Sequence, residues 1–382
     1  MEDLAQRAEQ LFIERYGRRP SLIARAPGRV NIIGEHTDYN DGFVMPIATD
    51  LATWTAAATR DDRLVRVYSE AMGAPAEFSL DELQRFGGWV DYLQGVAWAL
   101  AQEAVELRGL DAVVVSSVPP GSGVSSSAAL EVSWALAMLT AAGVELEPKR
   151  LALLCQRAEN EFVGMKCGVM DQLASVLGRD GHAILLDCRS LDHELVPVPA
   201  EEVAVVVMDT GVPRSLVDSE YNIRRTQCEE AARALGVPAL RDASLADLEA
   251  VRDKLDETTF RRARHVITEN ARVHEAAGAF AAGDFERVGE LINASHFSLR
   301  DDYEVSCPEL DLICEIARVQ EGCFGARLVG AGFGGCAMAL VEADVVERFA
   351  SAVKGEYDAR SGRTSTIFAV RAAEGASAWR VP

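Results

Sequence analysis

Hydrophobic residues in the first 208 residues of the chain form short apolar runs that alternate with longer helical stretches. The runs at 111–115, 183–187 and 203–208 are rich in Val, Ile and Leu, as is typical of buried strands. Residues 22–33 predict a strand, a turn at Pro27 and Gly28, and a second strand. Two shorter strands are expected at 54–58 and 64–68. Helices are expected at 2–16, at 87–108, at 128–142 and from Pro148 onward.

The pattern changes after residue 209, where helical periodicity dominates. Residues 219–235 and 258–282 each predict a long helix. This change gives a candidate domain boundary, with one unit at 1–208 and a second at 209–382. The boundary contains no Pro/Ser-rich linker, and we therefore expect the two units to pack tightly. Strands followed by helices indicate an α+β fold, although the pattern does not supply its topology.

The composition narrows the class of partner. The chain has 382 residues and a formal net charge of −21. Nucleic acids and anionic membranes both require a basic face, so neither is expected as the main partner. The eight cysteines include no Cys-x-x-Cys pair, which favours reduced, buried thiols over a zinc site. The charged N-terminus and the lack of a membrane-length apolar run predict a cytoplasmic protein.

Residues 116–129 join the end of a strand to the start of a helix through a loop of prolines, glycines and serines. Free N–H groups and the positive end of the helix dipole would meet there, which suits a phosphate. A Walker loop requires a Gly-Lys pair, whereas Gly123 is followed by Val124, so an ordinary nucleotide triphosphatase loop is excluded. The alternative is a structural turn in which serines cap the helix.

A second polar cluster lies at 34–42, between two apolar segments. A solvated loop would explain its Asp, Asn and Gly residues. Gathering Glu35, His36 and Asp38 in one loop instead favours a site, because carboxylates and imidazole suit a polyhydroxylated ligand.

Three further residues each have two interpretations. Trp89, near a predicted helix start, is either a core aromatic or a platform for a planar base. Glu159 borders the apolar face of the helix from Pro148, where a solvated glutamate is the simpler explanation. Asp171 follows flexible glycines in an apolar setting, and it is either a helix-capping acid or a carboxylate base.

Near the C-terminus, Gly330, Gly332 and Gly335 form a literal Gly-x-Gly-x-x-Gly. A dinucleotide-binding loop would open a helix, but residues 336–341 form another apolar strand pattern. The glycines between two strands therefore indicate a close approach of backbone to a ligand or to a neighbouring loop.

Three segments in this order resemble the motifs of the GHMP small-molecule kinases: residues 120–129, residues 330–335 and an N-terminal substrate segment. The substrate segment, 26–42, reads Ala-Pro-Gly-Arg-Val-Asn-Ile-Ile-Gly-Glu-His-Thr-Asp-Tyr-Asn-Asp-Gly and closely resembles the galactokinase family signature. This signature is highly specific, whereas the glycine loops mark only the superfamily. The resemblance implies the GHMP architecture. An N-terminal substrate- and ATP-binding α+β domain (1–208) and a ferredoxin-like α+β domain (209–382) would enclose the site in a cleft.

The resemblance also implies an activity. The γ-phosphoryl group of ATP, with Mg²⁺, would be transferred to the anomeric 1-hydroxyl of α-D-galactose, giving galactose 1-phosphate. Asp171 falls on the base candidate of the family. Arg29 falls on the arginine that would neutralise charge developing on the transferred group. The positions that would bind the sugar are Glu35, His36, Asp38, the backbone at Gly168, and Tyr221.

Nucleotide and metal positions follow from the same resemblance. The loop that would wrap the ATP phosphates comprises Gly121, Ser122, Gly123, Val124, Ser125, Ser126 and Ser127. Trp89 resembles the residue that stacks on adenine. Ser127 and Glu159 fall on the magnesium ligands, which agrees with the preference of Mg²⁺ for few protein ligands and several phosphate oxygens.

The departures from the family pattern are small. Val124 replaces the usual leucine, and Ser122 and Ala331 stand where glycine is common, which affects only the fine shape of the phosphate pocket. A kinase for a related sugar such as N-acetylgalactosamine is one alternative. A non-catalytic galactose and ATP sensor is another, but it would be expected to lose the serine loop or the Asp171–Arg29 pair. We expect a small-molecule sugar substrate and a monomer or weak homo-oligomer.

Overall fold

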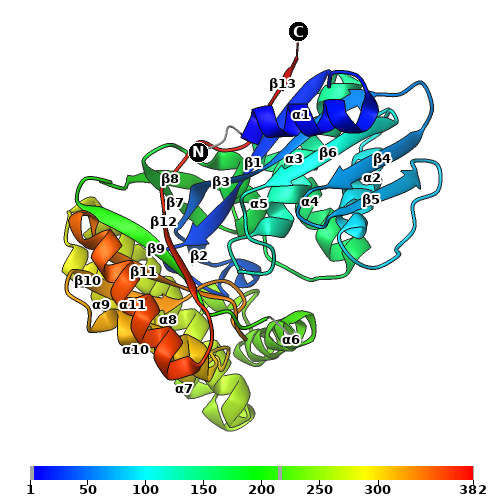
Figure 1. Cartoon of the computed structure of the whole chain (residues 1–382). Helices are drawn as coiled ribbons and strands as arrows, with labels where there is room; N and C mark the ends of the chain where they lie inside the picture. Colours follow the sequence, from blue (N-terminus) through cyan, green and yellow to red (C-terminus); the bar gives the residue numbers. More distant parts are fainter. Residues whose placement is uncertain (1–3, 214–216, 382) are drawn as a thin grey trace.

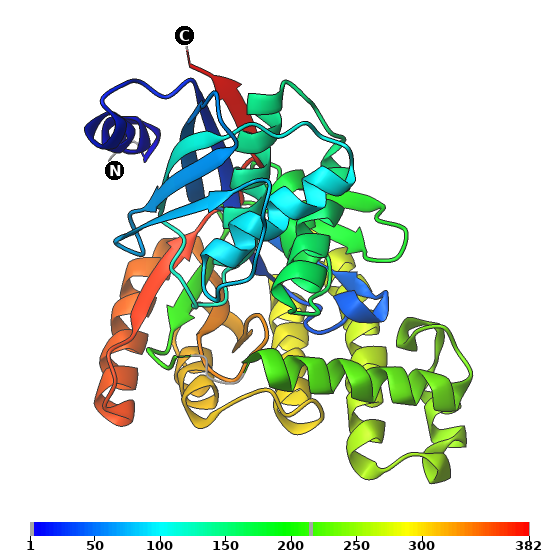
Figure 2. The same cartoon turned by 90° about the vertical axis from the view of Figure 1, so that its right-hand side faces the viewer.

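The computed structural model describes residues 4–213 and 217–381. They form two lobes that mix helices and sheets, with the N-terminal lobe above the C-terminal lobe in Figures 1 and 2. This arrangement confirms the predicted α+β class with two domains.

A six-stranded sheet with the order β13-β1-β3-β6-β4-β5 forms the centre of the N-terminal lobe. Its strands are β1 (Leu22–Asn31), β3 (Pro46–Thr59), β4 (Leu64–Ser69), β5 (Ala74–Ser79), β6 (Leu110–Ser116) and β13 (Ser377–Arg380). The helices of this lobe are α1 (Leu4–Tyr16), α2 (Val90–Gln102), α3 (Ser126–Ala142), α4 (Pro148–Arg157) and α5 (Met170–Leu177). A smaller sheet contains β2 (Phe43–Val44), β7 (His182–Asp187) and β8 (His193–Pro197).

The apolar run in strand β6 does not alternate with polar residues, and the packing of the strand explains this pattern. Successive side chains of a strand point to opposite faces of the sheet. Val113 and Val115 pack with α1 on one face, while Ala112 and Val114 belong to the core beneath α2 and α3 on the other. Both faces of β6 are therefore buried.

Strand β1 differs from the predicted strand, turn and strand. It is one continuous strand whose pairing with β3 shifts register between Pro27 and Arg29. A bulge accommodates proline inside a sheet. At this bulge a Cβ added to Gly28 would lie 2.5 Å from the carbonyl oxygen of Val124, so glycine allows β1 to touch the serine loop.

An antiparallel sheet with the order β10-β11-β9-β12 forms the C-terminal lobe. Its strands are β9 (Val203–Asp209), β10 (Cys323–Leu328), β11 (Cys336–Glu342) and β12 (Thr366–Val370). Its helices are α6 (Val217–Leu235), α7 (Leu245–Ala250), α8 (Glu257–Ala281), α9 (Phe285–Asp301), α10 (Pro308–Arg318) and α11 (Val346–Ser361). Short 3₁₀ turns span Leu240–Asp242, Arg252–Lys254 and Ala343–Val345.

The chain crosses between the lobes more than once. Strand β9, which the predicted units 1–208 and 209–382 assign to the first, pairs with β11 and β12 of the C-terminal sheet. Strand β13, at the other end of the second unit, pairs with β1 of the N-terminal sheet. The division at residue 208 stays a prediction, and the sheet pairings favour one nearer the start of β9.

A shared core joins the two lobes. Val30 and Ile47 of the first sheet pack in the same buried cluster as Val205 and Leu340 of the second. Arg327 of β10 is fully buried beside this cluster. Its guanidinium donates to the carbonyl oxygens of Asn31, Ile32 and Leu328 at 2.5, 2.8 and 2.8 Å, and it pairs with Glu35 at 3.2 Å.

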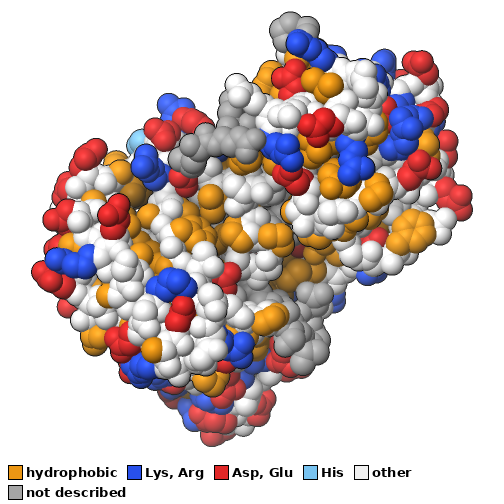
Figure 3. Space-filling view, in the orientation of Figure 1, with side chains coloured by type: hydrophobic (Ala, Val, Ile, Leu, Met, Phe, Trp, Pro, Cys, Tyr) orange, Lys and Arg blue, Asp and Glu red, His pale blue; other side chains and the backbone are white. Residues whose placement is uncertain are grey.

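Charged side chains of both signs are interspersed on the face shown in Figure 3, and hydrophobic side chains gather where the lobes join. Among residues 4–213 and 217–381, no helix combines the length and apolarity needed to cross a lipid bilayer.

We predict that Arg327→Met strongly destabilises the fold, because it leaves buried carbonyl groups without their donor and the buried Glu35 carboxylate without its charged partner. The loss in free energy of unfolding should be about 3–5 kcal/mol in urea denaturation. Arg348→Met, at an exposed arginine of the same lobe, is the control and should change little. Equal stability of the two variants would contradict this role of Arg327.

Candidate active site

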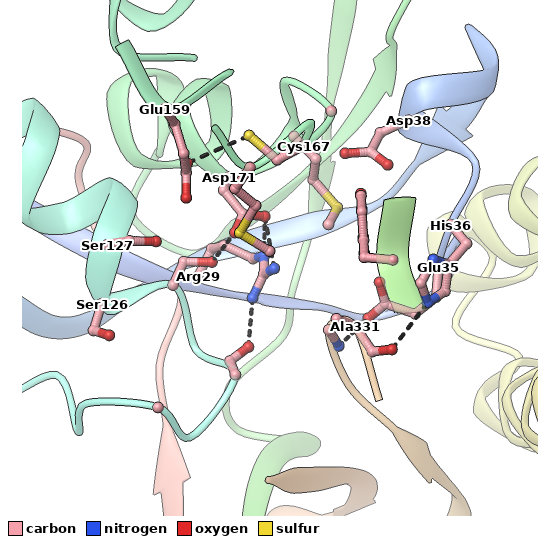
Figure 4. Close-up of a pocket in the computed structure, with 18 of the residues that line it drawn as sticks. Arg29, Glu35, His36, Asp38, Ser126, Ser127, Glu159, Cys167, Asp171 and Ala331 are labelled. Carbon is pink, nitrogen blue, oxygen red and sulfur yellow. Dashed lines mark hydrogen bonds and ion pairs between the residues drawn. The ribbon is translucent and has the colours of Figure 1, made fainter. Parts of the chain in front are cut away.

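One cavity of about 590 Å³ lies between the lobes and collects most of the residues predicted to form a site. It is lined by Arg29, Glu35, His36, Asp38, Tyr92, Gly121, Gly123, Ser125, Ser126, Ser127, Glu159, Met165, Cys167, Gly168, Met170, Asp171, Tyr221, Gly330 and Ala331. Figure 4 shows Arg29 and Asp171 in its centre, with Ser126, Ser127 and Glu159 on one side and Glu35, His36, Asp38 and Ala331 on the other.

An ion pair between Arg29 and Asp171 forms the centre of the cavity. Arg29 projects from β1 and is 5% exposed, whereas Asp171 stands in the first turn of α5 and is 27% exposed. The Nε and Nη2 atoms of Arg29 lie 2.8 and 2.6 Å from Oδ1 of Asp171. The Nη1 atom donates to the carbonyl oxygen of Gly123 at 2.6 Å. One guanidinium therefore fixes both the Asp171 carboxylate and the loop from Gly121 to Ser127, the glycine-serine loop.

The glycine-serine loop presents its last serines to the cavity. Ser125 is the residue before α3, and its left-handed backbone (φ 61°) turns the chain into the helix. Its hydroxyl donates to Oδ2 of Asp171 at 2.5 Å. Ser126 and Ser127 form the first turn of α3, where free backbone N–H groups favour an anion.

The side chains of Ser122 and Val124 in this loop point away from the cavity. The Ser122 hydroxyl donates to the carbonyl oxygen of Pro119 at 2.8 Å, and the Val124 side chain is fully buried in the shared core. Neither side chain lines the cavity. Their predicted contribution to phosphate binding is therefore limited to the backbone.

Glu159 is buried, in contrast to the solvated position that its helix pattern favoured. It lies in a single π-helical segment, Ala158–Val163, that follows α4. Its Oε2 atom accepts hydrogen bonds from Nε2 of Gln172 at 2.9 Å and from the Cys167 thiol at 3.3 Å. Gln172 also donates to the buried Glu131 at 3.1 Å. Burial, and then the nearby Glu159, raise the pKa of Glu131 well above its usual range.

The opposite side of the cavity combines residues from both lobes. Glu35, from the loop after β1, accepts a hydrogen bond at 2.8 Å from the backbone N–H of Gly330 in the C-terminal glycine loop. The His36 Nε2 atom lies 3.2 Å from the carbonyl oxygen of Ala331. Burial, followed by the neighbouring His265, lowers the pKa of His36 to about 3, so this imidazole is neutral.

Asp38 begins the 3₁₀ turn Asp38–Asn40 and lies against the loop before α5. A Cβ added to Gly168 would lie 2.0 Å from the Asp38 carboxylate, so a residue larger than glycine does not fit there. Burial, and then the carboxylates of Asp171 and Glu35, raise the pKa of Asp38 to about 7. Tyr221 of α6 lines the same side, with its ring centroid 5.4 Å from that of His36.

Trp89, the predicted adenine platform, does not line this cavity, and its contact with adenine stays a prediction. Trp89 precedes α2 and packs against the core of the N-terminal lobe, whereas Tyr92, one turn later, lines the cavity. The sequence pattern missed Tyr92 and Gln172. Gln172 had a sequence signal, since it directly follows Asp171.

Three family models match the chain in the order of these elements. The model described as the galactokinase galactose-binding signature matches residues 10–59, which contain Arg29 and the loop with Glu35, His36 and Asp38. The GHMP kinases N terminal domain matches residues 91–179, and the GHMP kinases C terminal model matches residues 276–359.

Relatives with similar sequences extend over nearly the whole chain. The galactokinase of Roseiflexus sp. (strain RS-1) is 48% identical over 370 residues, which are 95% of this chain and 94% of the relative. The galactokinase of Chloroflexus aggregans (strain MD-66 / DSM 9485) is 49% identical over 372 residues, with 95% of each chain covered.

Solved structures show the same relationship. Lactococcus lactis galactokinase complexed with galactose superposes with a TM-score of 0.94 at 37% identity, covering 98% of this chain and 100% of that one. The mevalonate kinase of Methanococcus jannaschii, at 18% identity and a TM-score of 0.66 over 92% and 98% of the two chains, shares the fold alone. The identities over full length, together with the signature at 10–59, show that the chain belongs to the galactokinase family of GHMP kinases.

Proposed function

We propose that this protein transfers the γ-phosphoryl group of ATP to the anomeric hydroxyl of α-D-galactose, giving galactose 1-phosphate and ADP. The observation that carries the proposal is the position of the Arg29–Asp171 pair. It lies between the serine loop on one side and the Glu35–His36–Asp38 loop on the other, in a single cavity. Phosphoryl transfer requires mainly that two substrates be aligned and their charge stabilised, and this arrangement supplies both.

Asp171 is the proposed base or orienting group for the sugar hydroxyl. Its carboxylate faces the cavity with Oδ1 paired to Arg29 and Oδ2 accepting from Ser125. A sugar hydroxyl on this carboxylate would point its oxygen toward the serine loop. The Arg29 guanidinium is close enough to the same point to stabilise negative charge that develops during transfer.

The phosphates of ATP are proposed to bind at the loop from Gly121 to Ser127. Two features support this proposal. The first turn of α3 has free backbone N–H groups, and Gly121 and Gly123 adopt a positive φ, which glycine allows without strain. Tyr92 is the residue on α2 that lines the cavity, so we assign the contact with adenine to Tyr92 in addition to Trp89.

Mg²⁺ is proposed to bind at Ser127 and Glu159, which both line the cavity. A hydroxyl and a carboxylate are hard oxygen donors, and they suit an ion that completes its shell with phosphate oxygens and water. Among residues 4–213 and 217–381, no group of three or more His, Cys, Asp and Glu side chains could hold a metal by itself. The ion would neutralise charge on the phosphates during transfer.

The sugar is proposed to contact Glu35, His36, Asp38, Tyr221 and the backbone at Gly168. Four polar side chains converge on this side of the cavity, and glycine at position 168 leaves room for the Asp38 carboxylate beside its backbone. The galactose complex of the Lactococcus lactis relative supports this choice of ligand. The predicted cytoplasmic location and monomeric or weakly oligomeric state stay predictions.

The substrate is tested by ADP release with a panel of sugars. Galactose should give the highest kcat/KM, and chelation of Mg²⁺ should abolish turnover. Higher kcat/KM for N-acetylgalactosamine would assign the protein to the related kinase instead. Binding of galactose and ATP without any turnover would indicate a sensor.

Asp171→Asn should lower kcat by a factor of about 10²–10⁴, the range for loss of a general base, while galactose binding measured by calorimetry stays within a few-fold. The amide keeps the size of the side chain, so the cavity is preserved. Asp180→Asn, at an exposed aspartate beyond the end of α5, is the control and should leave kcat unchanged. An unaltered kcat in Asp171→Asn would remove Asp171 from the reaction.

Galactose affinity should depend on pH through Asp38, whose pKa is raised to about 7. Sugar hydroxyls that donate to Asp38 favour its ionised form, so binding should release a proton and strengthen as the pH rises through 7. Between pH 6 and pH 8 the Kd should fall by about tenfold, because the ionised fraction of an acid with a pKa of about 7 rises from about one tenth to about nine tenths over this range. Asp38→Asn should flatten this dependence. A Kd that rises over the same range would mean that the protonated acid binds the sugar.

A further inference from the structure

A chain of hydrogen bonds runs from the sugar side of the cavity into the C-terminal lobe. Nδ1 of His36 lies 2.8 Å from the Tyr39 hydroxyl, which lies 2.6 Å from the Tyr303 hydroxyl. The Tyr303 hydroxyl in turn lies 3.1 Å from the thiol of Cys228 on α6. His36 and Tyr39 belong to the segment after β1, whereas Tyr303 and Cys228 belong to the C-terminal lobe, so this series of hydrogen bonds is a contact between the two lobes.

The contact between His36 and the Ala331 carbonyl fixes the direction of every hydrogen bond in this series. The carbonyl oxygen of Ala331 can only accept, so Nε2 of His36 carries the proton. In a neutral imidazole, Nδ1 is then an acceptor, and Tyr39 must donate to it. The Tyr39 oxygen accepts from Tyr303, and the Tyr303 oxygen accepts from the Cys228 thiol.

Tyr303 lies in the middle of this series of hydrogen bonds, and neighbouring residues hold it from several sides. Tyr303 is fully buried, and its carbonyl oxygen accepts from Nε of Arg224 at 2.8 Å. Its ring centroid lies 4.6 Å from that of His265 and 4.8 Å from that of His36. His265 Nε2 also lies 3.1 Å from the carbonyl oxygen of Glu35. Helix α8 therefore contacts both Tyr303 and the loop that carries His36.

The cluster stays uncharged near neutral pH. Burial lowers the pKa of His36 to about 3 and that of His265 to about 4, and burial raises the pKa of Tyr39 and of Tyr303 well above the usual tyrosine value. Asp38, beside this cluster, is the group that titrates near pH 7.

We propose that Tyr39 and Tyr303 are positioning residues that hold His36 as its Nε2–H tautomer and thereby fix the sugar-binding loop against the C-terminal glycine loop. The sugar contact of His36 rests on the proposed function, whereas the tautomer does not. With the proton on Nε2, His36 offers a donor at the Ala331 loop. With the proton on Nδ1, a bare Nε2 would face the Ala331 carbonyl and the two electron-rich atoms would repel each other.

The tautomer is measured by nitrogen-15 NMR of histidine-labelled full-length protein, with His36→Asn to assign the signals. The native protein should show a protonated Nε2 and an unprotonated Nδ1 for His36, unchanged from pH 5 to pH 8. Tyr39→Phe should shift both signals, because Nδ1 loses its donor. A protonated Nδ1 in the native protein, or signals that Tyr39→Phe leaves in place, would overturn the proposal.

Kinetics test the consequence for the sugar. Tyr39→Phe should raise KM for galactose by about tenfold while kcat and KM for ATP stay within about twofold, as for loss of a group that positions a ligand contact. Tyr303→Phe should act in the same direction. Because the two hydroxyls act in series, the double variant should be little worse than Tyr39→Phe alone. Additive effects on KM would show two independent packing defects and would contradict the proposal that Tyr303 acts through Tyr39.

Tyr357→Phe is the matched control, since it removes another buried tyrosine hydroxyl, which donates to the carbonyl oxygen of Thr210 at 2.9 Å in the same lobe. It should lower stability without changing the His36 signals or KM for galactose. If it changed them equally, the effect of Tyr39→Phe would be general loosening, and the positioning role would be wrong. A native protein that fails to phosphorylate galactose would refute the proposed function, while the NMR measurement would still decide the tautomer.

Discussion

The contact between Arg29 and Asp171 is the constraint on which the site depends. The two residues are 142 positions apart, and they meet because β1 and α5 pack in the N-terminal lobe. The guanidinium is almost fully buried, so its charge requires compensation by a carboxylate and by carbonyl oxygens. The guanidinium also donates to Gly123, and Asp171 accepts from Ser125, and both of these residues belong to the glycine-serine loop. Satisfying one buried arginine thus aligns the carboxylate with the phosphate-binding loop.

The sugar side of the cavity depends on a different set of contacts, which join the lobes. Glu35 accepts from the backbone of the C-terminal glycine loop and from Arg327, and Gly34 donates its N–H to the buried Glu269 of α8 at 3.0 Å. Burial raises the pKa of Glu269, but Arg272 and His265 more than offset this and lower it to about 2, so Glu269 is a permanent acceptor. The serine loop belongs to one lobe, whereas the Glu35–His36–Asp38 loop is shaped by both. Loss of the interface would therefore affect the sugar side first.

The sequence predicted those strands and loops whose formation depends on residues that are neighbours along the chain. The apolar run at 111–115 became β6 because both its faces are covered, and the apolar strands on either side of Gly330–Gly335 became β10 and β11. The signature 26–42 and the serine loop marked residues that line the cavity. Contacts between distant segments carried no local signal. The pairing of β13 with β1, the burial of Glu159 beneath Gln172, and the Tyr39–Tyr303 contact each depend on packing across the fold.

A crystal structure with galactose and a non-hydrolysable ATP analogue tests the central claim most directly. The anomeric hydroxyl oxygen should lie within hydrogen-bond distance of the Asp171 carboxylate, the γ-phosphate should lie beside Arg29, and the remaining phosphates should lie on the loop from Gly121 to Ser127. An anomeric oxygen or a γ-phosphate bound away from the Arg29–Asp171 pair would contradict it.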